Sequence, residues 1–147
     1  MLGLCLAIAP GGVWYAMVGT VSYQPIPLML AVLFWVAGFD VLYSCQDVEF
    51  DRKNELQSVP KKFGIKNALI LARCSHVLSA VFLALFGIVN QLGVFYFIGL
   101  FFFLAFLLWQ HLLVKNNDLS RIDQAFFTAN GAASVLFFVG VLLDGLI

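Results

Sequence analysis

Residues 40–64 read DVLYSCQDVEFDRKNELQSVPKKFG, and this charged stretch stands beside a long apolar run. It carries Asp40, four further acidic residues and four basic residues, whereas residues 1–39 contain no Asp, Glu, Lys or Arg. Charge is costly inside a bilayer, so a charged stretch at the edge of an apolar run indicates both a membrane boundary and a functional site. We therefore expect the rest of the chain to hold this segment against a membrane.

The composition of the whole chain supports a membrane protein. Of its 147 residues, 63% are hydrophobic and 11% are charged, whereas a soluble domain carries about 25% charged residues. Residues 74–114 and 124–143 are also free of charged side chains. Since a membrane-spanning helix needs about 20 apolar residues, the sequence predicts an all-α bundle of about five spans in one membrane domain over residues 1–147. The predicted spans are residues 1–20, 28–45, 67–89, 94–114 and 124–143.

The charges are arranged asymmetrically along this pattern. The formal net charge is zero, which suggests no nucleic-acid partner. All eight basic residues fall in or beside the second and fourth connections, which an alternating topology places on one side of the membrane. The positive-inside rule makes that side the cytoplasm. The basic residues are Arg52, Lys53, Lys61, Lys62, Lys66, Arg73, Lys115 and Arg121.

The charged stretch has a spacing that suits metal and phosphate chemistry. If the second span continues as a helix past Cys45, at about 100° per residue, Asp47 and Asp51 lie within about 20° of Asp40. Three carboxylates on one face repel each other unless a cation offsets their charge. Mg²⁺ takes one or two carboxylates and leaves its other positions to water and substrate phosphates. The sequence thus favours a Mg²⁺-bridged diphosphate at this face.

Neighbouring residues extend this hypothesis. Arg52, Lys53 and Lys61 lie close enough in sequence to neutralise the remaining phosphate charge, as does Lys62. The alternative is a solvated, mixed-charge loop that only sets the topology. Asp40 argues against that alternative, because it lies about two helical turns deeper than Asp47, where an unpaired carboxylate is costly. Tyr43 beside it is able to donate a hydrogen bond.

The same residues carry a resemblance to a known family. The runs FDVLY at 39–43, DVEFD at 47–51, NELQSVP at 54–60 and FG at 63–64 resemble the second aspartate-rich motif of the UbiA superfamily of intramembrane aromatic prenyltransferases. The sequence looks most like the branch that acts on 4-hydroxybenzoate and related precursors of quinones. The runs PGGVW at 10–14 and FFTANG at 126–131 are similar to the fifth and ninth helices of the family.

The resemblance implies a fold and a reaction. Family members form a nine-helix bundle around a central cavity, and their two aspartate-rich motifs hold Mg²⁺ and a polyprenyl diphosphate. Ionisation of the diphosphate gives an allylic cation that an aromatic acceptor such as 4-hydroxybenzoate attacks, in ubiquinone or menaquinone biosynthesis. Carried over by position, Asp47 and Asp51 are the expected metal ligands, and Asp40 and Tyr43 are the expected catalytic residues nearer the cavity. Arg52, Lys53 and Lys61 are expected to bind the diphosphate.

The chain also departs from the family pattern. The first aspartate-rich motif is absent, as is a Tyr- and Lys-containing motif that the family carries ahead of the helix similar to residues 1–20. We therefore expect the chain to be the C-terminal part of a longer enzyme, whose N-terminal half is its partner, in the inner membrane of a bacterium. Two alternatives remain from the residues alone: a fragment of a cation transporter that uses the three aspartates as an ion path, and a non-catalytic membrane scaffold.

Two histidines and one asparagine also lie inside predicted spans, and the sequence predicts structural roles for them. His76 and His111 lie inside predicted spans without a further ligand at metal spacing, so structural or interfacial roles are expected. Asn130 is expected to form a hydrogen bond between helices.

Overall fold

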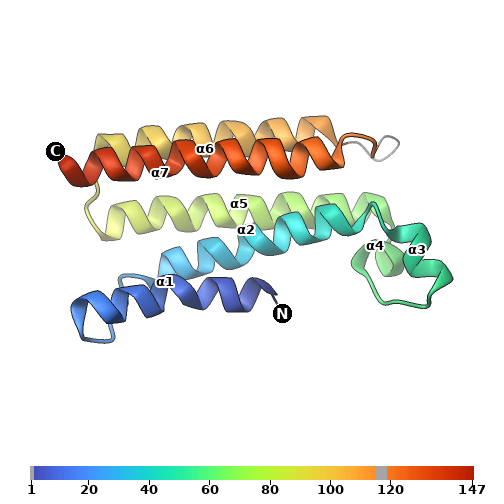
Figure 1. Cartoon of the computed structure of the whole chain (residues 1–147), viewed down its shortest axis with the longest axis horizontal. Coiled ribbons are helices and arrows are strands. Elements are labelled where there is room, and N and C mark those ends of the chain that lie inside the picture. The colour runs from blue at the N-terminus through green and yellow to red at the C-terminus, as the bar shows by residue number, and fades with distance from the viewer. Residues whose placement is uncertain (1, 115–118) are drawn as a thin grey trace.

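The computed structural model describes residues 2–114 and 119–147, and the regular structure within them is entirely helical (Figure 1). Five longer helices form the bundle, and two short helices, α3 and α4, fill the second connection. A single π-helical turn, η1, leads into the last helix. The elements are α1 (Leu2–Val18), α2 (Ile26–Ser44), α3 (Val48–Lys53), α4 (Val59–Phe63), α5 (Ile65–Val89), α6 (Val94–Leu113), η1 (Gln124–Ala129) and α7 (Asn130–Leu146).

The length and composition of these helices confirm the prediction of a membrane helix bundle. Among the described residues, four segments are long and apolar enough to cross a bilayer: Ile26–Ser44, Ile65–Val89, Val94–Leu113 and Phe127–Leu146. Helix α1 is apolar too, but its 17 residues extend only about 26 Å, slightly less than the ~30 Å hydrocarbon core. The five predicted spans are therefore observed as four long helices and one shorter apolar helix.

Helices α2 and α5 form the centre of the bundle. Ala68 and Ala72 of α5 are fully buried and pack with Leu42 and Cys45 at the end of α2. Small residues allow helix backbones to approach closely in a membrane, where dispersion contacts rather than hydrophobic burial drive association. Closer to the other end, Ala31 of α2 contributes to a second buried cluster, which includes aromatic residues of α6.

Helix α1 packs on α2 through small residues spaced four apart. Gly3 and Gly11 belong to this row, in which a Cβ atom on Gly3 would lie 3.4 Å from Val36 and one on Gly11 would lie 2.7 Å from the sulfur of Met29. Ala7 between them is buried. Figure 1 shows α1 along the half of the bundle that is distant from α3 and α4. The row of small residues therefore determines how close α1 comes to α2.

Helices α6 and α7 form the other close pair. A Cβ atom on Gly140 would lie 2.7 Å from the Cα of Gly99, so the two backbones touch at this crossing. The carboxylate of Asp144 accepts hydrogen bonds from the backbone N–H of Gly93 at 2.7 Å and of Tyr96 at 3.3 Å. Asp144 thus caps the first turn of α6 from the neighbouring helix, where a negative charge also favours the helix dipole.

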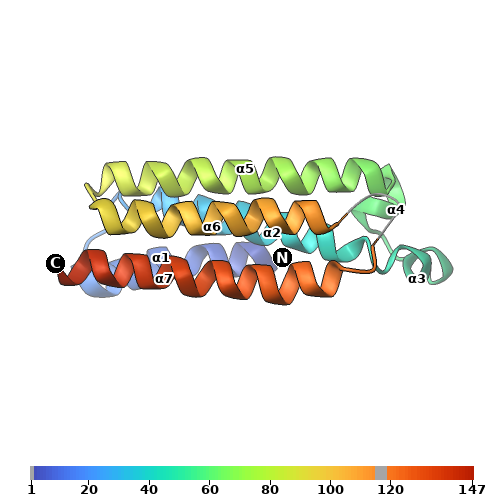
Figure 2. The same ribbon diagram turned by 90° about the horizontal axis from the view of Figure 1, so that it is seen from above.

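The connections are sorted between the two ends of the bundle. In both views α3 and α4 lie together at one end, and the chain enters η1 at this end as well (Figures 1 and 2). The α1–α2 and α5–α6 connections and the C-terminus lie at the opposite end. This is the alternation that the charge pattern requires, although Lys115, one of the basic residues in that pattern, lies outside the described residues.

Candidate active site

The candidate site begins at the end of α2. Asp40 is exposed and lies one turn before the last residue of the helix, Ser44. Tyr43 is half-buried and packs against the cluster formed by Leu42 and Cys45. These two predicted catalytic residues therefore share the last two turns of one membrane helix.

The expectation that this helix continues past Cys45 is wrong. Helix α2 ends at Ser44, and the next backbone bonds span three residues, from Cys45 N–H to the Leu42 carbonyl at 3.2 Å and from Gln46 N–H to the Tyr43 carbonyl at 3.0 Å. Side chains contribute to the break, because the Ser44 hydroxyl and the Cys45 thiol both donate to the carbonyl of residue 41, at 2.8 and 3.4 Å. Asp40 and Asp47 consequently do not lie on one continuous helix.

Asp47 and Asp51 nevertheless lie one helical turn apart. Asp47 precedes α3 as its N-cap residue, and the N–H of Asp51 donates to the carbonyl of Asp47 at 2.8 Å. Residues four apart in a helix present their side chains on the same face, with Cβ atoms about 5–6 Å apart. Asp47 is exposed, whereas Asp51 is only 8% exposed. In this pair, the carboxylate of Asp47 is therefore accessible to solvent, whereas Asp51 is buried.

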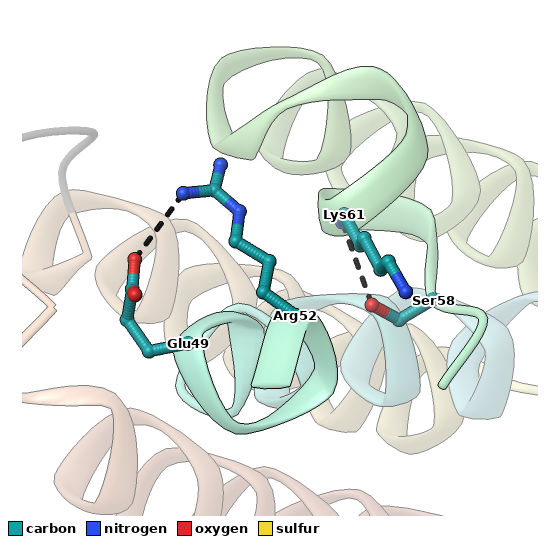
Figure 3. A network of polar contacts seen from close by, with 4 residues as sticks. All are labelled: Glu49, Arg52, Ser58 and Lys61. Atoms are coloured by element: carbon teal, nitrogen blue, oxygen red, sulfur yellow. Dashed lines mark hydrogen bonds and ion pairs between the residues drawn. The ribbon is translucent and has the colours of Figure 1, made fainter. Parts of the chain in front are cut away.

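Helix α4 brings one predicted basic residue to this pair. The Nζ of Lys61 donates to the backbone carbonyl of Asp51 at 3.3 Å. Lys61 is held in place because the Ser58 hydroxyl caps α4 by accepting from the Lys61 N–H at 3.4 Å (Figure 3). Ser58 followed by Pro60 in the first turn is a helix-start signal that would have located α4 from the sequence. The ammonium group of Lys61 therefore lies beside α3.

The other two predicted diphosphate ligands lie differently. Arg52 forms an exposed ion pair with Glu49 at 3.3 Å, one turn back on α3 (Figure 3). Lys53 is exposed in the last turn of the same helix. An exposed ion pair is weak, about 0–1 kcal/mol, so Arg52 is free to exchange Glu49 for another anion.

The donor set at this end of the bundle is limited. Within the described residues, no three His, Cys, Asp or Glu side chains converge on a point that could hold a metal ion. The predicted face of three carboxylates is thus not formed, because the break after Ser44 separates Asp40 from the other two. What remains is a pair of carboxylates, which suits a hard cation that completes its coordination with water and phosphate oxygens.

Apolar grooves extend away from this end along α2. A groove of about 550 Å³ runs between α1 and α2, and its lining includes Trp14, Trp35 and Phe39. A second hollow of about 260 Å³, between α2, α6 and α7, shares Trp35 with it. The indole Nε1 of Trp35 donates to the Oδ1 of Asn130 at 3.3 Å, which is the interhelical hydrogen bond expected of Asn130. The other side-chain atom of this amide, Nδ2, is buried with no partner among the described residues.

Sequence comparisons identify the proteins that this chain resembles. The sequence model described as "UbiA prenyltransferase family" matches residues 1–140. Proteins named 4-hydroxybenzoate octaprenyltransferase are 30% identical in Nitrosomonas eutropha over 146 residues and 29% identical in Nitrosospira multiformis over 146 residues. Each alignment covers 99% of this chain and 50% of the relative. The relative in Pseudomonas fluorescens is 31% identical over 117 residues, which cover 80% of this chain and 39% of that protein.

The alignments also show how much of each relative this chain matches. The chain spans about half the length of the curated relatives it matches. No solved structure shows significant similarity to the chain.

Proposed function

The chain belongs to the UbiA prenyltransferase family, and from this premise we propose that it takes part in transferring a polyprenyl group from a polyprenyl diphosphate to an aromatic acceptor. The relatives' names suggest 4-hydroxybenzoate as the acceptor. This reaction belongs to quinone biosynthesis, and ubiquinone is the product class that this acceptor suggests. Because the chain spans about half of its relatives, the remaining part of the active site comes from a segment similar to their other half.

The observation that carries this proposal is the arrangement of Asp47, Asp51 and Lys61. Two carboxylates one helical turn apart, with an ammonium group beside them, form a half-site for a metal-bridged diphosphate. Mg²⁺, when bound, would supply positive charge that offsets the carboxylates and the leaving diphosphate. Asp47 and Asp51 would hold the ion, and Lys61, with Arg52 and Lys53, would face the phosphate charge that remains.

The proposed reaction breaks the allylic carbon–oxygen bond and one aromatic carbon–hydrogen bond, and it forms one carbon–carbon bond. The allylic carbon–oxygen bond to the diphosphate breaks with the electron pair leaving on oxygen, a ring carbon of the acceptor bonds to the allylic carbon, and the ring loses a proton. Groups that neutralise the leaving diphosphate lower the barrier, because negative charge develops there. We assign the acceptance of this proton to Asp40, which is exposed near the end of α2, and Tyr43 lies on the following turn.

The apolar grooves provide a place for the rest of the substrates. A polyprenyl chain is a branched hydrocarbon, and the groove of about 550 Å³ between α1 and α2 is lined almost entirely by apolar side chains. Asn130 offers its buried Nδ2 donor next to Trp35, which suits a polar group of the aromatic acceptor. Trp35 lies five residues before Asp40 on α2, about 7.5 Å along the helix axis. The proposal places the charged end of the bundle at the cytoplasmic side of a bacterial inner membrane.

The first prediction tests the carboxylate pair in a complete enzyme. We expect a chimaera in which residues 1–147 replace the matching half of the Nitrosomonas eutropha relative to prenylate 4-hydroxybenzoate in a Mg²⁺-dependent manner. Asp47→Asn and Asp51→Asn should each lower turnover about 100-fold or more, since each removes a ligand needed to stabilise the leaving group. Turnover is measured as prenylated product by chromatography of membrane extracts.

Glu49→Gln is the matched control for this test. It removes one negative charge from α3, as the aspartate substitutions remove one at or in that helix. Glu49, however, lies about 200° around the helix from both Asp47 and Asp51, and it forms a solvent-exposed ion pair with Arg52. Turnover of Glu49→Gln should stay within about threefold of the parent, as expected for the loss of a weak surface ion pair. Near-normal turnover of Asp47→Asn and Asp51→Asn would remove both residues from the mechanism.

A further inference from the structure

A groove between α5 and α6 lies apart from the site described above. It encloses about 480 Å³, a volume typical of ligand sites, and shares no lining residue with the grooves around Trp35. Its walls are mostly Leu, Val and Ala, and polar side chains gather at one end of it. The polar residues are Arg73, His76 and His111.

The two histidines form a fixed polar floor at that end. The Nδ1 of His76 lies 2.8 Å from the Nε2 of His111, so one ring donates a hydrogen bond to the other, and the ring centroids are 4.9 Å apart. His76 is 3% exposed, and its ring occupies the space that a side chain on Gly38 of α2 would fill. The pair is therefore set by packing between three helices, and it joins α5 to α6 where the groove opens.

Arg73 supplies the charge of the groove. It is exposed, and within the described residues it has no acidic partner, since the ion pair found there joins Arg52 to Glu49. Arg73 lies eight residues into α5, about 12 Å from its start at Ile65. An arginine at that depth in a bilayer keeps its guanidinium group near the level of the headgroups. A planar guanidinium group matches the oxygens of a phosphate, which it binds with two hydrogen bonds.

The apolar part of the groove continues from Arg73 towards the middle of the membrane. Ala80 lies on α5 seven residues after Arg73, and Leu104 lies on α6 seven residues before His111. Both are therefore about 10 Å further from the polar end of the groove. A ligand that fits must therefore combine an anionic group at the level of the headgroups with a hydrocarbon chain below it. A phospholipid combines both at these depths.

We propose that the α5–α6 groove binds one anionic phospholipid, with its phosphate on Arg73 beside the His76–His111 pair and an acyl chain along the groove. The site requires only that the helices span a bilayer, so it does not rest on the prenyltransferase proposal. Arg73 binds the phosphate, and the other basic residues at this end repel a headgroup that carries its own cation. An anionic lipid such as phosphatidylglycerol is therefore favoured over a zwitterionic one.

The second prediction is tested by native mass spectrometry of the 147-residue chain released from detergent micelles containing phosphatidylglycerol and phosphatidylcholine. We expect one phosphatidylglycerol molecule to be retained in preference to phosphatidylcholine. Arg73→Gln should lower that retention at least fivefold, because it removes the phosphate ligand. Leu108→Trp should lower it too, since the larger side chain fills the groove from its α6 wall.

Arg121→Gln is the matched control, because Arg121 is exposed at the same end of the bundle and does not line the groove. It should retain phosphatidylglycerol as the parent does, and the circular dichroism of all variants should be unchanged. Equal retention of the two lipids by the parent would overturn the proposal. So would an equal loss in Arg121→Gln, or unchanged retention in Arg73→Gln. Displacement of the lipid by geranylgeranyl diphosphate at equimolar concentration would assign the groove to an isoprenoid substrate and also overturn it.

Discussion

Cys45 is the residue at which the membrane helix α2 gives way to the charged segment. It is 1% exposed, it packs in the cluster with Leu42 and Ala72, and its thiol donates to a backbone carbonyl of α2. Burial disfavours the charged thiolate and raises the pKa of Cys45 to about 11. Its chemistry therefore reports whether the turn after α2 is packed as the structure shows.

The third prediction concerns the alkylation of this thiol. Because the thiolate is the reacting form, Cys45 at pH 8 should react with N-ethylmaleimide about 100-fold more slowly than a thiol of ordinary pKa. Its rate should rise about tenfold per pH unit and level off only near pH 11, since the thiolate fraction follows the raised pKa. The rate is measured by mass spectrometry in a chain in which Cys5 and Cys74 are replaced by serine.

A neighbouring position provides the control for access. Gln46→Cys in a Cys45→Ala background places an exposed thiol in the same turn. It should react faster and level off near pH 9, as an unperturbed thiol does. If Cys45 and the thiol at position 46 react at equal rates with the same pH profile, Cys45 is not buried and the turn has a different packing.

Among the helices, hydropathy was sufficient to locate the spans, but their ends depended on contacts. The sequence predicted apolar segments at residues 28–45 and 94–114, which differ by one or two residues from α2 and α6. The break after Ser44 was not predicted, because it coincides with a tertiary contact, the packing of Cys45 against α5, that hydropathy does not reveal. The one-turn spacing of Asp47 and Asp51 was predictable, since four residues make a helical turn wherever the helix begins.

The contacts that bring residues of different helices together at the site could not be predicted from the sequence. Lys61 reaches the backbone of Asp51 because α4 folds back beside α3, and this depends on a connection of irregular backbone between Asn54 and Ser58. The same is true of His76 and His111, which are 35 residues apart and meet because of the register of α5 against α6. Hydropathy identifies helices but does not fix their relative register.

The fourth prediction concerns the crossing of α6 and α7. Gly140→Ala would place a Cβ atom 2.7 Å from the Cα of Gly99 and 2.8 Å from the carbonyl oxygen of Phe95, and neither backbone atom is able to turn aside. The helices must separate, so we expect the free energy of unfolding to fall by about 1–3 kcal/mol. It is measured by titrating the chain in mild detergent with sodium dodecyl sulfate and following ellipticity.

Gly131→Ala on the same helix is the control, because a Cβ atom there has no neighbour within 4 Å. It should leave stability unchanged or raise it by up to about 1 kcal/mol, since alanine favours a helix over glycine. If Gly140→Ala were as stable as Gly131→Ala, the close approach of α6 and α7 would be contradicted.

For the whole molecule, the sorting of charge between the two ends determines how the bundle sits in a membrane. The short helices α3 and α4 carry Arg52, Lys53, Lys61 and Lys62 at one end, and the opposite connections carry no basic residue (Figure 1). Basic residues near the ends of spans are retained on the cytoplasmic side. The proposed diphosphate half-site lies at this same end, where a charged, water-soluble group is able to reach it.

The fifth prediction is that the α3–α4 end faces the cytoplasm. Gln57→Cys, exposed between α3 and α4, should react with a membrane-impermeant maleimide only in inside-out vesicles. Thr20→Cys, exposed between α1 and α2, should react only in right-side-out vesicles or intact spheroplasts. Both are made in a chain whose native cysteines are replaced, and labelling is read as a mass shift on a gel. Reaction of the thiol at position 57 from outside would reverse the topology. It would also place the carboxylates of Asp47 and Asp51 on the side away from a cytoplasmic supply of prenyl diphosphate. This one measurement therefore tests both the orientation and the proposed reaction.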